Sequence, residues 1–171
     1  RAQDTVVVYT SDNGYSWGEQ TLTGKRWAYD VSADVPLLVR WPSGIVDPGT
    51  ERAAPVLNID LAPSLLDMAG LPIPGTIQGL SWAPLLAADD EQWRPAVYYE
   101  YFADYPYQVP PNQAIRTPEW LYIEYDRGLP PELYARVDDS DQRNNLYGDP
   151  GTEVIVGELS AALAQLRVEA R

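Results

Sequence analysis

The sequence predicts an α/β core followed by a small antiparallel sheet with a packed C-terminal helix. Apolar, β-branched runs at 5–10 and 34–42 are typical of strands buried in a parallel sheet. Partial alternation of apolar and polar residues at 119–125 and 132–137 indicates antiparallel strands with one solvent-exposed face. Apolar residues at helical spacing in 152–167 predict a closing helix.

The first part of the chain, residues 1–95, is predicted to be the α/β core. Between its first two strands lies a polar and aromatic stretch, 11–34, which is predicted to be a long loop. Loops of this length in compact domains are usually functional, so a site is expected there.

A strand at 55–59 and then a helix are predicted further along this part. Asp60 is suited to cap the helix, because a carboxylate there can accept hydrogen bonds from the first free backbone N–H groups. Gly70 is suited to end it. A second short helix is expected in LSWAPLLA, with Ser81 as its cap, and the acidic residues 89–91 are expected in a solvated loop.

The second part, residues 96–171, is predicted to be a small α+β subdomain. The character of the sequence changes between about 95 and 112, where a proline-rich stretch appears. Residues 129–131 are expected to form the turn between the two antiparallel strands. The closing helix is predicted to bury a stripe formed by Val154, Ile155, Leu159, Ala162, Leu163 and Leu166.

Composition and charge limit the function classes open to the chain. Its 171 residues and 45% hydrophobic content are typical of a globular protein with a core. The formal charge of −13 disfavours binding to nucleic acid or to an anionic membrane surface. No run approaches the ~18 apolar residues of a membrane span. Since cysteine and histidine are absent, disulfides, thiolate zinc sites and histidine-activated nucleophiles are excluded within this chain.

Two oxygen-bearing side chains stand at the carboxyl end of the first predicted strand. In open α/β sheets, ligands bind at that edge, and Asp12 and Asn13 follow the strand directly. A carboxylate and an amide carbonyl are hard ligands that suit Ca²⁺ or Mg²⁺. Two ligands are too few for Ca²⁺, which takes ~6–8 oxygens. The alternative interpretation is an Asn-Gly turn in which Asp12 is the hydrogen-bonding partner.

Lys25 is the only lysine of the chain, and its compact charge suits a tetrahedral oxyanion. A phosphate-binding loop is rejected, because five residues separate Gly18 from Gly24 where that motif needs four. Arg26 also replaces the Ser or Thr that would bind Mg²⁺. The alternative interpretation of Lys25 is a solvated surface side chain.

Three long segments resemble the sulfatase family. The first is VVVYTSDNGYSWGEQTLTGKRWAYDVSADVPLLVRWP, in which S-D-N-G ends a strand and a G-E-x-x-x-x-G-K stretch follows. The second is NIDLAPSLLDMAGLPIPGTIQGLSWAPLL, and the third is PELYARVDDSDQRNNLYGD. The resemblance covers nearly the whole chain in order, so it is more specific than any one motif.

The resemblance implies a site and a chemistry. Asp12 and Asn13 would be two ligands of the divalent cation, most often Ca²⁺ in this family, and Mg²⁺ is the alternative. Lys25 would hold a sulfate oxygen and act in catalysis. The implied reaction is hydrolysis of a sulfate ester by a formylglycine nucleophile. The substrate would be a sulfated small molecule or glycan.

Two departures from the family pattern stand out. Gln20 follows the Gly-Glu pair where many relatives carry histidine, which puts an acid or ionic role at that position in doubt. The nucleophile motif and the remaining metal ligands of the family are absent from this chain. We therefore expect the C-terminal portion of an alkaline-phosphatase-like sulfatase, whose N-terminal half supplies the formylglycine. The isolated chain is expected to be inactive, to bind Ca²⁺ weakly at most, and to pair with that half or with a second copy through an exposed sheet edge.

Alternative functions remain open at this point. The parent protein can be a phosphoester or phosphonate hydrolase on the same scaffold, although Asn13 favours a sulfatase because those relatives tend to carry histidine there. The chain can also be a non-catalytic glycan- or protein-interaction module. Residues 138–145 fail the calcium-loop pattern and are expected to form a solvated turn. Aromatic residues able to stack on a substrate ring, or else to pack in the core, are Trp17, Trp27, Tyr29, Tyr105 and Tyr107.

Overall fold

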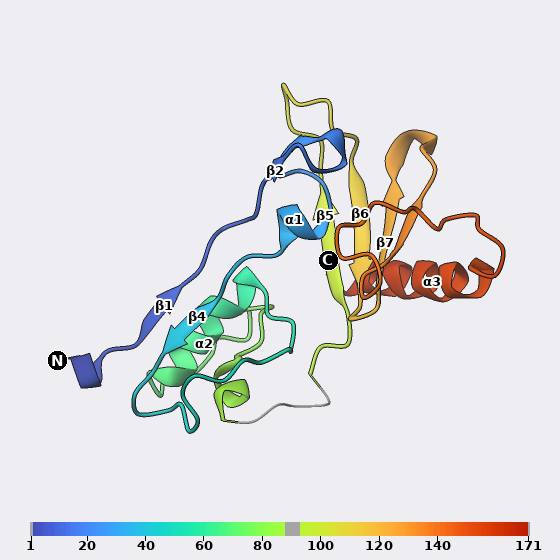
Figure 1. The fold of residues 1–171 in the computed structure, drawn as a ribbon. Helices are drawn as coiled ribbons and strands as arrows, with labels where there is room; N and C mark the ends of the chain where they lie inside the picture. Colours follow the sequence, from blue (N-terminus) through green and yellow to red (C-terminus); the bar gives the residue numbers. More distant parts are fainter. Residues whose placement is uncertain (1, 88–92, 171) are drawn as a thin grey trace. The chain divides into compact units, whose positions relative to one another are not determined.

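The computed structural model describes residues 2–87 and 93–170 (Figure 1). The chain forms two compact units. Unit 1 consists of Arg1–Asp12 and Pro36–Arg94, and unit 2 consists of Asn13–Val35 and Pro95–Arg171. The division into domains at 95/96 stays a prediction, but the segment Asn13–Val35 groups by its contacts with the C-terminal part of the chain.

Unit 1 contains a two-stranded sheet, one α-helix and several 3-10 turns. Its α-helix is stopped at Gly70, which adopts a positive φ of 68°. The elements are η1 (Ala2–Asp4), β1 (Val7–Tyr9), β4 (Leu38–Arg40), η3 (Asn58–Asp60), α2 (Leu61–Met68) and η4 (Ala83–Leu86).

The two strands of unit 1 pair antiparallel, with Val8 opposite Val39. Strands were expected at both places and are present. The expectation that they are buried on both faces of a parallel sheet is wrong for the described residues. Val7 is 50% exposed and Leu38 is 64% exposed, because β1 and β4 form a sheet of two strands only.

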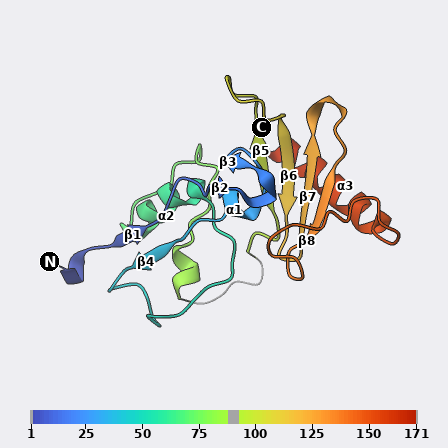
Figure 2. The same cartoon turned by 45° about the horizontal axis from the view of Figure 1, so that its top comes forward.

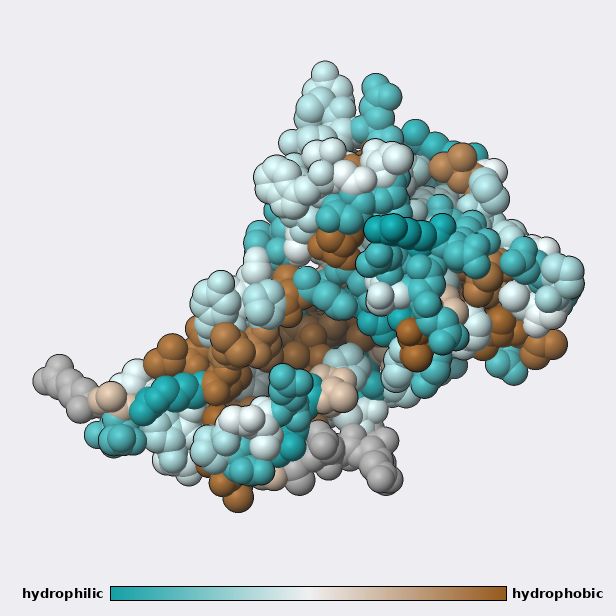
Figure 3. All heavy atoms as spheres, viewed as in Figure 1, coloured by the Kyte–Doolittle hydropathy of each residue, from teal (hydrophilic) through white to brown (hydrophobic). Residues whose placement is uncertain are grey.

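Apolar side chains gather on the face of unit 1 that Figure 3 shows. Figure 3 shows brown, hydrophobic spheres gathered over the part that holds β1, β4 and α2. An exposed apolar patch of this kind is typical of a surface that contacts further polypeptide. The exposed large apolar residues of this unit are Val7, Tyr9, Leu38, Val46, Ile59, Leu65, Leu71, Ile73 and Leu80.

The carboxylate of Asp60 organises unit 1, in a different way from the predicted one. Asp60 stands at the N-cap position of α2, as predicted, but its side chain makes no capping hydrogen bond to that helix. Its buried carboxylate accepts hydrogen bonds from the backbone N–H groups of Leu57 and Leu80, both at 2.8 Å. It also receives Arg94, at 2.8 and 2.9 Å. The bond from Leu57 caps the 3-10 turn η3, which is closed by the backbone hydrogen bond from Asp60 N–H to the carbonyl of Leu57 at 2.9 Å. The strand predicted at 55–59 is therefore wrong.

The second short helix of unit 1 is the 3-10 turn η4. Ser81 Oγ accepts a hydrogen bond from the N–H of Ala83 at 3.2 Å and donates one to Asp67 at 2.6 Å. The N-cap of η4 is Trp82, so the prediction that Ser81 is the cap is wrong by one residue, although Ser81 Oγ accepts a bond from the first backbone N–H of the turn. The solvated loop predicted at 89–91 lies outside the described residues.

Unit 2 is a four-stranded antiparallel sheet in the order β5-β6-β7-β8, with α3 against one face (Figure 2). Strand β6 was not predicted from the sequence, and the stretch 11–34 contains short elements where a loop was expected. The elements are β2 (Ser16–Trp17), η2 (Glu19–Thr21), β3 (Thr23–Gly24), α1 (Asp30–Ala33), β5 (Val97–Tyr101), β6 (Asn112–Arg116), β7 (Trp120–Tyr125), η5 (Asp126–Gly128), β8 (Glu132–Ala135) and α3 (Glu153–Glu169).

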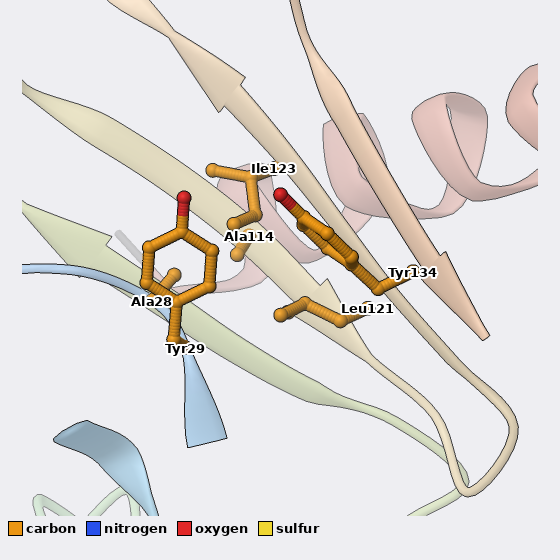
Figure 4. Packing of buried hydrophobic residues seen from close by; sticks show 6 residues of the cluster. All are labelled: Ala28, Tyr29, Ala114, Leu121, Ile123 and Tyr134. Carbon is orange, nitrogen blue, oxygen red and sulfur yellow. The ribbon is translucent and has the colours of Figure 1, made fainter. Parts of the chain in front are cut away.

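Both faces of this sheet are buried, so the expected solvent-exposed face is wrong. On one face, Ile115, Tyr122 and Leu133 pack against Leu159 and Leu163 of α3. The predicted stripe of α3 is thus confirmed, except that Val154 is 73% exposed. The opposite face is covered by the segment that precedes α1, as Figure 4 shows for the cluster of Ala28, Tyr29, Ala114, Leu121, Ile123 and Tyr134.

Among the described residues, no helix combines the length and the apolar character needed to cross a membrane.

Candidate active-site hairpin

A short hairpin, β2–β3, carries the predicted lysine. Ser16 is paired with Gly24, and Trp17 is paired with Thr23. The connection between the two strands begins at Gly18, whose φ of 137° lies in a region that residues with a Cβ atom rarely adopt. Ser16 and Gly24 point to the buried side of the hairpin. Their neighbours in sequence therefore point to the exposed side.

The structure brings two of the three predicted site residues into contact. Lys25 follows β3, and its Nζ donates a hydrogen bond to Asn13 Oδ1 at 2.7 Å. Asn13 Nδ2 in turn donates to the carbonyl of Gly14 at 2.7 Å, which fixes the direction of the amide oxygen. Asn13 and Lys25 are therefore held together within unit 2.

Asp12 is the last residue of unit 1 and is exposed. Its backbone carbonyl accepts a hydrogen bond from Asn58 Nδ2 at 2.7 Å. Its carboxylate accepts a long hydrogen bond from Ser11 Oγ at 3.4 Å. Asp12 thus presents a solvent-facing carboxylate one peptide bond before Asn13.

The donor set fits a hard divalent cation in kind but not in number. A carboxylate of Asp12 and an amide oxygen of Asn13 are suitable ligands for Ca²⁺ or Mg²⁺. Within the described part of the chain, no group of three acidic, histidine or cysteine side chains is placed to hold a metal ion. Any metal bound at Asp12 and Asn13 therefore takes most of its ligands from elsewhere.

The strand that leads from Asn13 into the hairpin is anchored on the short helix α1. Gly14 N donates to the carbonyl of Ser32 at 2.9 Å. The hydroxyls of Ser16 and Ser32 are 3.2 Å apart in a hydrogen bond between two buried side chains. A side chain at Gly14 would collide with the backbone of Val31, which is why this position is a glycine.

Helix α1 is anchored in turn by Asp30. Arg116 contacts its carboxylate at 2.8 Å and Arg136 contacts it at 2.9 Å. The backbone N–H of Asp30 donates to Oε1 of Gln142, a side chain that is buried. These side chains were not found from the sequence, because their partners lie about a hundred positions away and no local pattern marks them.

A family model described as "N-sulphoglucosamine sulphohydrolase, C-terminal" matches residues 18–169. The chain is 35% identical over 151 residues to an N-acetylglucosamine-6-O-sulfatase of Bacteroides thetaiotaomicron. That match covers 85% of the chain and 27% of the relative. The chain belongs to the sulfatase family.

Solved structures agree with this sulfatase assignment. One is a complex of a protein with its substrate, D-glucosamine-2-N,6-O-disulfate. It matches with a TM-score of 0.89 and 33% identity, over 96% of this chain and 34% of that one. A phosphonate monoester hydrolase of Silicibacter pomeroyi matches with a TM-score of 0.85 and 27% identity, over 98% of this chain and 35% of that one. The predicted fold, the C-terminal portion of an alkaline-phosphatase-like sulfatase, is confirmed. The chain spans about a third of the length of these proteins.

Gln20 has a structural contact in this sulfatase chain. Its Nε2 donates to the carbonyl of Asp141 at 2.5 Å and, more weakly, to that of Gln142 at 3.4 Å. An amide is sufficient for this contact because only a donor is required. The residue thus ties the hairpin loop to the segment before the last helix.

The segment 138–145 forms turns, but it is not wholly solvated as expected. Its Asp139 carboxylate accepts hydrogen bonds from the N–H groups of Arg143 and Asn144, at 3.0 and 2.8 Å. Gln142 is 1% exposed with φ of 52°. Gln142 is buried because its side-chain amide accepts a hydrogen bond from the backbone N–H of Asp30, the first residue of α1.

The predicted aromatic residues divide into two groups. Trp27 and Tyr29 pack in the core of unit 2. Burial is the main cause of the raised pKa of Tyr29 and Tyr134, and the negative charge of the nearby Glu132 contributes further. Both hydroxyls donate a hydrogen bond to the Glu132 carboxylate. In contrast, Trp17, Tyr105 and Tyr107 are exposed, and Arg26 lies 3.2 Å from the ring centroid of Tyr107.

Proposed function

We propose that this chain is the part of a sulfate-ester hydrolase that supplies one cation and two metal ligands to the active site. The observation that carries the proposal is the 2.7 Å contact between Lys25 Nζ and Asn13 Oδ1 on the exposed side of the hairpin. It holds a point charge beside a hard oxygen ligand, as binding of a sulfate next to a divalent cation requires.

In this proposal, Lys25 binds a sulfate oxygen and opposes the negative charge that grows there in the transition state. Asp12 and Asn13 hold the divalent cation, Ca²⁺ or Mg²⁺. When bound, that cation would polarise the sulfuryl oxygens. Asn13 orients Lys25 through its amide oxygen. The formylglycine nucleophile is expected from the remaining part of the protein.

The proposed substrate is a sulfated glycan or a related small molecule. The support is that one relative is named an N-acetylglucosamine-6-O-sulfatase and that a structural neighbour is described with a disulfated glucosamine as its substrate. We also propose that the remaining part of the protein packs on the apolar surface of unit 1. Pairing with a second copy through that surface is the alternative.

The test is the hydrolysis of 4-nitrophenyl sulfate and of glucosamine 6-sulfate by the full-length protein. Lys25→Ala is expected to lower kcat/KM by about 100-fold or more, as for the loss of one charged transition-state contact. Arg143→Ala is the matched control, since it also removes one cation, from an exposed pair with Asp141. Equal activity of the Lys25 and Arg143 variants would rule out the proposed role.

Metal ligation is tested separately by the metal dependence of the same reaction. Asp12→Ala and Asn13→Ala are each expected to raise the Ca²⁺ or Mg²⁺ concentration needed for half-maximal activity after chelation. Lys25→Ala should not raise that concentration, because it removes a positive charge from beside Asn13 Oδ1. An unchanged metal requirement in both ligand variants would contradict the assignment.

The second candidate is a phosphonate monoester hydrolase, favoured by the structural match to such an enzyme. Comparing kcat/KM for an aryl sulfate with that for an aryl phosphonate monoester on the same protein separates the two. Preference for the phosphonate would select the second candidate.

A further inference from the structure

The hairpin that carries Lys25 also carries two aromatic rings on the same side. Every second residue along a strand points to the same face of the sheet, and residues paired directly across two strands share a face. Since Ser16 and Gly24 are buried and paired, Tyr15, Trp17, Thr23 and Lys25 are their exposed neighbours. The two rings and the ammonium group therefore share the exposed side of one small element.

The rings are placed as a pair. The centroids of Tyr15 and Trp17 are 4.6 Å apart, with an angle of 42° between the planes. Trp17 is 81% exposed and Tyr15 is 39% exposed. Trp17 thus buries little of its surface against the described residues, and the core of unit 2 forms without it.

The backbone fixes Trp17 independently of its side chain. Its N–H donates to Glu19 Oε2 at 2.6 Å. Hydrogen bonds from the backbone N–H groups of Glu19 itself and of Trp17 lower the pKa of the Glu19 carboxyl, so this contact is charged near neutral pH. The indole is presented by a preformed loop, which keeps the entropic cost of binding to it low.

We propose that Tyr15 and Trp17 form a stacking wall for the sugar ring whose sulfate is bound by Lys25, and that Trp17 sets the preference for sulfate esters carried on a ring. This inference rests on the proposed function. Aromatic faces bind the apolar faces of rings, while the adjacent cation selects the anionic substituent. A ring-free anion such as inorganic sulfate would contact Lys25 but neither of the two aromatic rings.

The test uses the full-length protein and two readouts. One is KM for the better substrate of 4-nitrophenyl sulfate and glucosamine 6-sulfate. The other is the inhibition constant of inorganic sulfate. Trp17→Ala is expected to raise KM about 2- to 10-fold, the range for a lost aromatic contact, with kcat little changed. The inhibition constant of sulfate should stay within about 2-fold, and Trp17→Phe should keep most of the affinity.

Tyr147→Ala is the matched control, because Tyr147 is as exposed as Tyr15, at 39%, and lies outside the hairpin. It should leave both constants unchanged. An unchanged KM in Trp17→Ala, or an equal rise of KM and the sulfate inhibition constant, overturns the stacking wall. Failure of the proposed function looks different, since Lys25→Ala would then leave both kcat and the sulfate inhibition constant unchanged.

Discussion

Replacing Arg94 by alanine is expected to destabilise unit 1 strongly. The guanidinium makes two hydrogen bonds to Asp60, at 2.8 and 2.9 Å, and one to the carbonyl of Pro55 at 3.1 Å. The Asp60 carboxylate is 0% exposed. Without Arg94 it keeps its two backbone donors but loses the one counter-ion that it contacts within the described part of the chain.

The magnitude follows from the burial of the remaining charge. Breaking a buried ion pair by removing one partner costs about 3–5 kcal/mol, because the charge left behind is no longer compensated. This is a large share of the ~5–15 kcal/mol by which folded proteins are stable. By contrast, Arg143→Ala removes an ion pair whose side chains are 77% and 66% exposed, and should cost below about 1 kcal/mol.

Urea unfolding followed by tryptophan fluorescence is a suitable assay, since Trp82 is buried in unit 1 and Trp93 donates to the carbonyl of Pro55. With slopes of about 1–3 kcal/mol/M, the midpoint of Arg94→Ala should fall by at least about 1 M. A fall as small as that of Arg143→Ala would refute the reasoning that the Asp60 charge depends on Arg94.

Two further predictions concern unit 2. Burial raises the pKa of Tyr99 and Tyr122 to about 12. Because the unfolded tyrosine has a pKa of about 10, their stabilisation is complete below pH ~10 and declines as the pH rises toward 12. The unfolding free energy measured against pH should show this decline, with a smaller slope in Tyr122→Phe and no change in the exposed Tyr105→Phe. Gln20→Ala should cost about 1 kcal/mol of stability through its lost backbone contact, while the pH dependence of ester hydrolysis stays unchanged. A displaced pH profile in that variant would instead assign Gln20 a part in catalysis.

The sequence predicted the elements whose signals are local. The closing helix was recognised from the spacing of Leu159 and Leu163, and β7 and β8 were recognised from their apolar residues. The prediction that one face of the sheet is exposed to solvent was wrong. Leu121, Tyr122 and Ile123 are consecutive apolar residues, so they place apolar side chains on both faces of β7. Such a run predicts a strand covered on both sides, but it does not reveal that residues near Tyr29 provide the second cover.

The same limit applies to the candidate site. Asn13 and Lys25 were singled out from residue types and from the family resemblance, and the structure places them in contact. The residues that support them were not predictable in this way. Asp30, Arg116 and Gln142 act through contacts between distant parts of the chain, and polar residues of these types are usually solvated.

The interleaving of the two units has a consequence for synthesis. Asn13–Val35 is made before Pro36–Arg94, yet its packing partners in unit 2 come only after that segment. A hairpin with strands as short as β2 and β3 is not stable alone, so it stays unstructured until β6 to β8 have been translated. The residues of the candidate site are therefore ordered by structure that is translated after them. A chain that terminates before β6 retains Asn13 and Lys25 in its sequence, but we expect it to lack the contact between Lys25 Nζ and Asn13 Oδ1.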